Sequence, residues 1–165
     1  EFFKSYNLKF TILRFGSIYG KNSNQENGLF RIMNSAINNN KILYEGPKKA
    51  VRKFIYVSDV VKIASKSISS FYDNKILMIT GKTSTRMDNL LEKVRIVTRI
   101  KKKDVIIKNK KINGHYLVEP KKFVFPKLIN IYPKKPIQLN NGLIKLYNYI
   151  MKSYRKNSSN KLNYK

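Results

Sequence analysis

Short apolar segments of strand length alternate with amphipathic segments along most of this chain. Apolar runs bounded by turn residues predict strands at residues 10–15, 41–44, 54–57, 76–79 and 105–107. Apolar residues at helical spacing predict helices over residues 29–37, 60–68, 87–97 and 139–154. Strands that alternate with helices are typical of an α/β fold with a largely parallel sheet.

The first apolar run has the composition of an interior strand. Residues 10–15 are mostly apolar and end at Gly16, which predicts a strand buried on both faces. Only residues 1–6, which resemble the end of a helix, come before it in this sequence. We therefore expect an incomplete sheet with an open apolar edge at this strand, and poor stability of the isolated chain.

Three further local expectations follow from sequence pattern. Ser58 and Asp59 are residue types that favour a helix N-cap, so we expect them to cap the helix over residues 60–68. The basic segment 108–136 holds four of the five prolines, which predicts irregular backbone there. We place a single folded region at residues 1–155 and a polar, frayed tail at residues 156–165.

The composition excludes several kinds of site. The chain has no cysteine, which excludes disulfides, thiolate metal sites and a cysteine nucleophile. It has one histidine, His115, so a metal site built from several histidines is excluded, and we expect no metal. No apolar run approaches the ~20 residues that a membrane-spanning helix needs, so we expect no membrane association.

The chain is strongly basic, with 35 Lys and Arg against 9 Asp and Glu and a formal net charge of +26. Such a charge is found in proteins that bind nucleic acids or anionic surfaces. The lysines are scattered, however, and Asn and Ile are abundant with them, as AT-rich coding DNA would produce. No helix-turn-helix, aromatic RNA-binding strand or zinc pattern accompanies them. Nucleic-acid binding is therefore kept only as an alternative that we do not favour.

Two stretches of sequence carry a family resemblance. The first is FTILRFGSIYG at residues 10–20, and the second is VRKFIYVSDVV at residues 51–61, which follows a turn at Gly46. Together, in this order, they resemble the extended short-chain dehydrogenase/reductase family, which comprises NAD-dependent nucleotide-sugar epimerases and dehydratases. The segments NGHYLVEP and NNGLIKLYNYI near the end of the chain are similar to the closing part of some members.

The resemblance implies the C-terminal portion of a Rossmann-like NAD(P)-binding fold, with its small substrate-binding subdomain. The Gly-rich turn that holds the dinucleotide in this family does not occur in the sequence. The family's catalytic Tyr-x-x-x-Lys would precede Glu1, so we assign no catalytic residue. Tyr44 and Lys48 have that spacing, but Gly46 and Pro47 between them prevent a shared helix.

The resemblance also assigns binding residues. It places Arg52 on the diphosphate or ribose of a nucleotide-sugar, a role that suits a planar guanidinium. It places Phe15 and Gly16 beside the nicotinamide of NAD or NADP. The family's pocket for the nucleotide-sugar would be lined by Ser17, Asn27, Leu29 and His115.

Each of these residues also has an ordinary structural explanation. Arg52 would be a solvated side chain at a strand start, and residues 15–17 a plain turn between a strand and a loop. Asn27 would be a helix N-cap beside an apolar Leu29, and His115 an exposed side chain. For Asp59 we favour a structural role over a catalytic one.

The predicted function is therefore that of a fragment of an NAD-dependent nucleotide-sugar epimerase or dehydratase that carries mainly the nucleotide-sugar-binding region. Whether the chain is itself an enzyme is left open, and we expect it to be inactive alone. The alternative is a non-catalytic nucleotide-sugar-binding remnant. The resemblance further implies a cytoplasmic protein and a homodimer in the full-length form. These expectations require residues 14–20 and 52–61 to form two walls of one crevice.

Overall fold

The computed structural model describes residues 5–108 and 128–162, with side chains up to residue 155. The strands are β1 (Thr11–Phe15), β2 (Ser17–Tyr19), β3 (Ile42–Glu45), β4 (Val51–Tyr56), β5 (Lys75–Ile79), β6 (Ser84–Arg86), β7 (Val105–Lys108) and β8 (Leu128–Ile131). The helices are α2 (Gly28–Asn39), α3 (Val57–Ala64), α4 (Met87–Thr98) and α5 (Leu139–Leu162). Short 3-10 turns cover Ser65–Ile68, Ser70–Tyr72 and Lys102–Asp104.

The strands form three small sheets. In the first, β1, β5 and β8 lie side by side in this order, and all are parallel. In the second, β4 lies between β2, to which it is parallel, and β6, to which it is antiparallel. The third is the parallel pair β3 and β7. The predicted α/β fold with mainly parallel strands is confirmed, although the strands do not form one continuous sheet.

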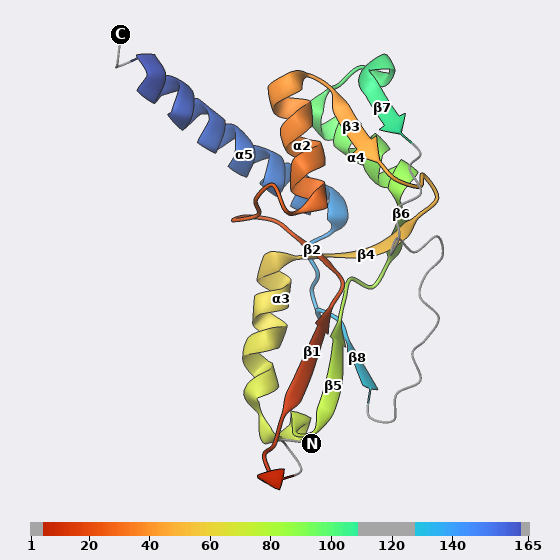
Figure 1. The fold of residues 1–165 in the computed structure, drawn as a ribbon, viewed down its shortest axis with the longest axis vertical. Coiled ribbons are helices and arrows are strands. Elements are labelled where there is room, and N and C mark those ends of the chain that lie inside the picture. Colours follow the sequence, from red (N-terminus) through yellow and green to blue (C-terminus); the bar gives the residue numbers. More distant parts are fainter. Residues whose placement is uncertain (1–4, 109–127, 163–165) are drawn as a thin grey trace.

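Helices cover these sheets in two groups (Figure 1). The helix α3 packs against the sheet of β1, β5 and β8, where Val60 contacts a small core with Leu77 and Ile79. The helices α2, α4 and α5 gather with β3 and β7 at the other end of the molecule. Their larger core includes Met33 of α2 and Leu90 of α4, both fully buried. The second sheet, through β2 and β4, joins the two groups (Figure 1).

The prediction that residues 10–15 form a strand buried on both faces is wrong in one respect. The strand exists as β1, but Ile12 is 45% exposed and Phe15 is 44% exposed. In the described part of the chain β1 has β5 on one side and no strand on the other. The open apolar edge that was expected at this strand is present in the described sheet.

The predicted cap of the helix after β4 is also wrong. The helix α3 begins at Val57, and its N-cap is Tyr56, which makes no side-chain capping bond. Asp59 lies in the first turn and is only 2% exposed. Its carboxylate accepts a hydrogen bond from the backbone N–H of Ile137 at 2.8 Å, so it joins distant segments.

Two expectations near the end of the chain need correction. The segment 108–136 was expected to be irregular throughout, yet residues 128–131 form β8, paired with β5 in parallel. The last helix was expected to end at residue 154, yet α5 continues to Leu162 and so runs into the predicted polar tail. No helix in the described ranges is both long enough and apolar enough to cross a membrane.

Candidate functional site

The two motif stretches lie side by side in the structure. The short strand β2 pairs in parallel with β4, with Ser17 opposite Phe54 and Tyr19 opposite Tyr56. A cavity of about 770 Å³ opens beside this pair. Its lining includes Ser17, Asn27, Leu29 and Arg52, together with residues of β3 and the start of α4. The two segments that the sequence analysis required to share one crevice therefore do so.

Asn27 shapes the wall of the cavity that comes from α2. Its side-chain oxygen accepts a hydrogen bond from Phe30 N–H at 3.1 Å, which caps the helix. Its side-chain nitrogen donates to the carbonyl of Ile18 in β2 at 2.8 Å. The amide thus holds the start of α2 against β2. The neighbouring Leu29, 5% exposed, anchors the same helix in the core.

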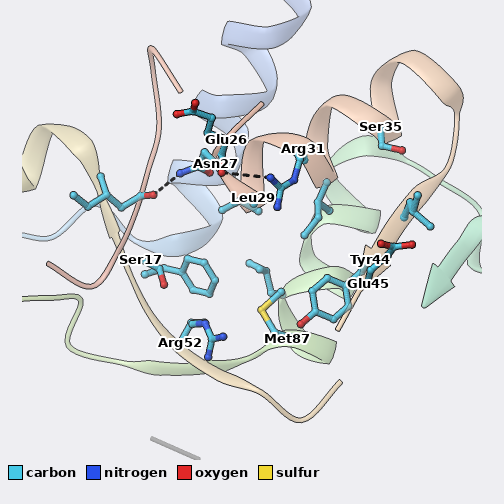
Figure 2. A pocket seen from close by; sticks show the side chains of 16 residues that line it. Ser17, Glu26, Asn27, Leu29, Arg31, Ser35, Tyr44, Glu45, Arg52 and Met87 are labelled. Carbon is cyan, nitrogen blue, oxygen red and sulfur yellow. Dashed lines mark hydrogen bonds between the residues drawn. The ribbon is translucent and has the colours of Figure 1, made fainter. Parts of the chain in front are cut away.

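Two arginines face the cavity from opposite walls. Figure 2 shows Arg52 on β4 at one side and Arg31 on α2 at the other. The Arg31 guanidinium donates to the backbone carbonyls of Gln25 at 3.1 Å and Glu26 at 3.5 Å, which ties it to the loop before α2. Arg52 donates to the carbonyl of Val51 at 2.8 Å. A guanidinium group carries its N–H donors in a planar fork, a geometry that suits an anionic ligand.

Tyr44 adds an aromatic wall to the cavity (Figure 2). It lies in β3, is 7% exposed, and its hydroxyl donates to the carbonyl of Pro47 at 3.3 Å. Burial raises the pKa of Tyr44, and the positive charge of Arg52 partly opposes this rise. Tyr44 lies in a strand before the turn, so the structure agrees that it shares no helix with Lys48.

Phe15 and Gly16 do not line this cavity. They lie at the carboxyl end of β1, where Gly16 N–H donates to the carbonyl of Ile79 in β5 at 2.9 Å. A side chain at position 16 would meet the carbonyl oxygen of Lys53 at 2.7 Å, so glycine is required by close backbone packing. His115 lies outside the described residues.

One known family is similar in sequence to the first part of the chain. The sequence model of the NAD dependent epimerase/dehydratase family matches residues 1–78. Over these residues, just under half of the chain, the sequence is similar to that family. The matched range contains β1, β2 and β4, and also Ser17, Asn27, Leu29 and Arg52. No curated protein matches the chain.

Solved structures of epimerases and dehydratases share the fold. UDP-glucose 4-epimerase from Thermotoga maritima, solved with UDP-glucose, superposes with a TM-score of 0.73 at 23% identity over 93% of this chain and 49% of its own. The dTDP-glucose 4,6-dehydratase from Bacillus anthracis, solved in complex with NAD, gives a TM-score of 0.73 at 18% identity over 93% of this chain and 48% of its own. The chain thus spans about half the length of these epimerase-type proteins.

Several residues of the cavity were not predicted from the sequence. Arg31 was not singled out, although it follows Asn27 by four positions and so lies on the same side of α2. Tyr44 was considered only as part of a false catalytic pair, and Glu45 was not considered at all. The alternation of side chains in β3 could not reveal these two, because Tyr44 and Glu45 are neighbours on opposite faces of the strand and both line the cavity.

Proposed function

We propose that this chain binds a nucleotide-sugar in the cavity between α2, β3 and β4, as the substrate-binding part of an NAD-dependent epimerase or dehydratase. The observation that carries the proposal is the convergence of Ser17, Asn27, Leu29 and Arg52 on one cavity. Its volume of about 770 Å³ falls within the roughly 300–1,000 Å³ that is usual for small-molecule sites. Related folds have been solved with UDP-glucose bound.

The cavity offers suitable partners for each part of such a ligand. Arg52 would bind the diphosphate through its planar fork of donors. The first N–H groups of α2, at Gly28 and Leu29, have no acceptor within the helix, and the positive end of the helix dipole favours an anion beside them. The Ser17 hydroxyl would form a hydrogen bond with the sugar. The ring of Tyr44 would provide an apolar wall against which the flat base of the nucleotide packs.

The proposal assigns NAD binding mainly to residues outside this chain. The sequence contains no Gly-rich phosphate-binding turn, which is the main dinucleotide site of this kind of fold. Phe15 and Gly16 lie at the carboxyl ends of parallel strands, the edge at which ligands bind in α/β sheets. These two residues would form a wall against the nicotinamide. The hydride chemistry would be supplied by NAD itself.

Calorimetric titration of the whole chain with UDP-glucose and dTDP-glucose tests the proposal. We expect binding of at least one of them, and a roughly 10–100-fold loss of affinity in Arg52→Ala, because a charge-assisted hydrogen bond contributes about 1.5–3 kcal/mol. Arg52→Lys should restore part of the affinity. Lys53→Ala is the matched control, since Lys53 is the next residue of β4 and does not line the cavity. Equal affinity in Arg52→Ala and Lys53→Ala would contradict the proposed role.

Five finer points remain predictions within this proposal. NAD or NADP would be the cofactor of the full enzyme, and the chain alone would lack activity. A homodimer would form in the full-length protein, and the location would be the cytoplasm. The reaction, whether epimerisation or dehydration, depends on acids and bases that we expect upstream of Glu1.

A further inference from the structure

Three polar side chains line the end of the cavity beside β3, and they present hydrogen-bond acceptors to a ligand. They are Ser35, Tyr44 and Glu45, and we call this part of the cavity the β3 end. The Ser35 hydroxyl donates its hydrogen to the carbonyl of Lys41 at 2.9 Å, and the Tyr44 hydroxyl donates to the carbonyl of Pro47. A hydroxyl has a single hydrogen, so both oxygens meet a ligand as acceptors.

Glu45 is the charged residue of the β3 end. Its Oε1 lies 3.7 Å from Nζ of Lys108, an ion pair that joins β3 to β7. An ionised carboxylate donates no hydrogen bond, and its two oxygens offer about four acceptor positions. Glu45 can therefore keep its contact with Lys108 and also accept hydrogen bonds from a ligand. Its side chain is partly exposed and lines the cavity, so a ligand can reach it.

The proposed binding mode puts the base of a nucleotide-sugar at the β3 end. The diphosphate would lie at Arg52 and the start of α2, and the sugar at the Ser17 hydroxyl. Figure 2 shows Ser17 on one side of the cavity and Tyr44 with Glu45 on the other. The base is attached on the side of the diphosphate away from the sugar, so it would meet Tyr44 and Glu45.

The bases differ in the hydrogen bonds that they offer to a carboxylate. Guanine has two neighbouring donors on one edge, N1–H and the N2 amine, and a carboxylate accepts from such a pair as it does from the paired N–H groups of arginine. Uracil and thymine have one donor, N3–H, between two carbonyl oxygens that a carboxylate repels. Adenine and cytosine have an amine beside a ring-nitrogen acceptor. A site made of acceptors therefore matches guanine best.

We propose that Glu45 selects a guanine base, so that the preferred ligand of the cavity is a GDP-sugar, an inference that rests on the proposed function. The Glu45 carboxylate accepts hydrogen bonds from guanine N1–H and the N2 amine while the ring packs against Tyr44. The same carboxylate disfavours a uracil or thymine base, because it faces one of their carbonyl oxygens. Specificity thus comes from an attractive and a repulsive contact of one side chain.

Calorimetric titration of the whole chain with GDP-glucose and UDP-glucose tests the preference, since these ligands share the glucose and the diphosphate. We expect GDP-glucose to bind at least about tenfold more tightly, because the wrong base leaves buried polar groups unpaired. Equal affinities, or tighter binding of UDP-glucose, would overturn the inference and leave the proposed function intact. Binding of neither ligand would overturn both.

Glu45→Gln should shift the preference toward UDP-glucose. A glutamine amide can accept from uracil N3–H and donate to the neighbouring carbonyl, so the ratio of the two affinities should fall at least about tenfold. Glu26→Gln is the matched control, because it makes the same change of charge in the loop before α2, also at the cavity. It should shift both affinities alike and keep their ratio. A ratio that stays the same in Glu45→Gln would overturn the inference.

A change in the ligand tests the same contact without a change in the protein. Inosine diphosphate has the N1–H of GDP but lacks the N2 amine. We expect it to bind the unchanged chain several-fold more weakly than GDP does, and to bind Glu45→Gln as GDP does, which is the coupling expected of a direct contact. Equal binding of GDP and inosine diphosphate to the unchanged chain would overturn the inference, even if Glu45→Gln failed to fold.

Discussion

The carboxylate of Asp59 accepts a hydrogen bond at 2.8 Å from the backbone N–H of Ile137, 78 residues further along the chain. Asp59 lies in the first turn of α3, directly after β4, and is 2% exposed. Ile137 lies just before α5, which begins at Leu139. The bond therefore links the first turn of α3, which follows the strand of Arg52, to the segment just before α5. This contact gives Asp59 a structural role.

Replacement of Asp59 by alanine should destabilise the fold, because the buried N–H of Ile137 would lose its acceptor. We expect the free energy of unfolding to fall by about 1–3 kcal/mol. Asp59→Asn, which keeps an acceptor oxygen at the same place, should lose less. Chemical denaturation of both variants measures the difference. Equal losses in alanine and asparagine would contradict the importance of this bond.

The two hydrogen bonds of Asn27 can be separated by substitution. Asn27→Asp keeps the cap on Phe30 N–H but can no longer donate to the carbonyl of Ile18. Stability should then fall by about 1–3 kcal/mol, because the cap is retained but a carboxylate oxygen faces the carbonyl of Ile18, which loses its donor. Affinity for UDP-glucose should also fall, since a carboxylate would stand in a cavity proposed to hold phosphates. Calorimetric titration beside a denaturant melt distinguishes the two effects.

Asn27→Ser is the control for this pair. Serine also caps the helix and adds no charge, so it should keep more affinity for UDP-glucose than aspartate does. If Asn27→Asp bound UDP-glucose as well as the unchanged chain, the phosphates would not lie near the start of α2.

Local sequence pattern was sufficient for most elements of this fold. Asn27 is the N-cap of α2, and Asn40 is its C-cap in the left-handed conformation. Asparagine is favoured at both positions. The motif residues Ser17 and Arg52 were correctly expected to share a crevice. Local pattern sufficed here because caps and apolar periodicity act within a few residues.

Errors arose where distant contacts decide the structure. Asp59 looked like a helix cap, but its partner is Ile137, which no local pattern could indicate. The strand β8 was missed because its pairing with β5, not its basic and proline-rich surroundings, makes it a strand. The strand over residues 10–15 was expected to be buried on both faces because of its composition, whereas Ile12 is 45% exposed, since neither described core covers its face of β1.

Gly142 in α5 lies against the hydroxyl of Tyr19, and a methyl group there would overlap it. Alanine normally stabilises a helix interior by about 1 kcal/mol relative to glycine. Gly142→Ala should instead destabilise this fold, because Tyr19 is 1% exposed and cannot move aside. Tyr19→Phe removes the oxygen and should restore part of the lost stability in the double variant. A melt of the two single variants and the double variant measures this coupling.

Burial raises the pKa of the Tyr19 hydroxyl, with smaller contributions from Tyr56 and Asp59 nearby. The unfolded chain has an ordinary tyrosine pKa of about 10, so above that pH the unfolded state ionises first. The free energy of unfolding should therefore fall as the pH rises from 10 toward the pKa of the folded state, by up to about 1.4 kcal/mol per pH unit for this group. Below pH 10 the contribution is fully present.

The measurement for this effect is a series of denaturant melts from pH 8 to pH 11 on the chain and on Tyr19→Phe. Lysines also lose their charge in this range, but they do so in both proteins, so the difference between the two curves isolates Tyr19. We expect Tyr19→Phe to show a shallower loss of stability above pH 10. Tyr6→Phe, at a side chain that is 65% exposed, is the control and should follow the unchanged chain. If stability fell with pH in parallel for Tyr19→Phe and the unchanged chain, the Tyr19 hydroxyl would reach solvent. That result would contradict its burial against α5.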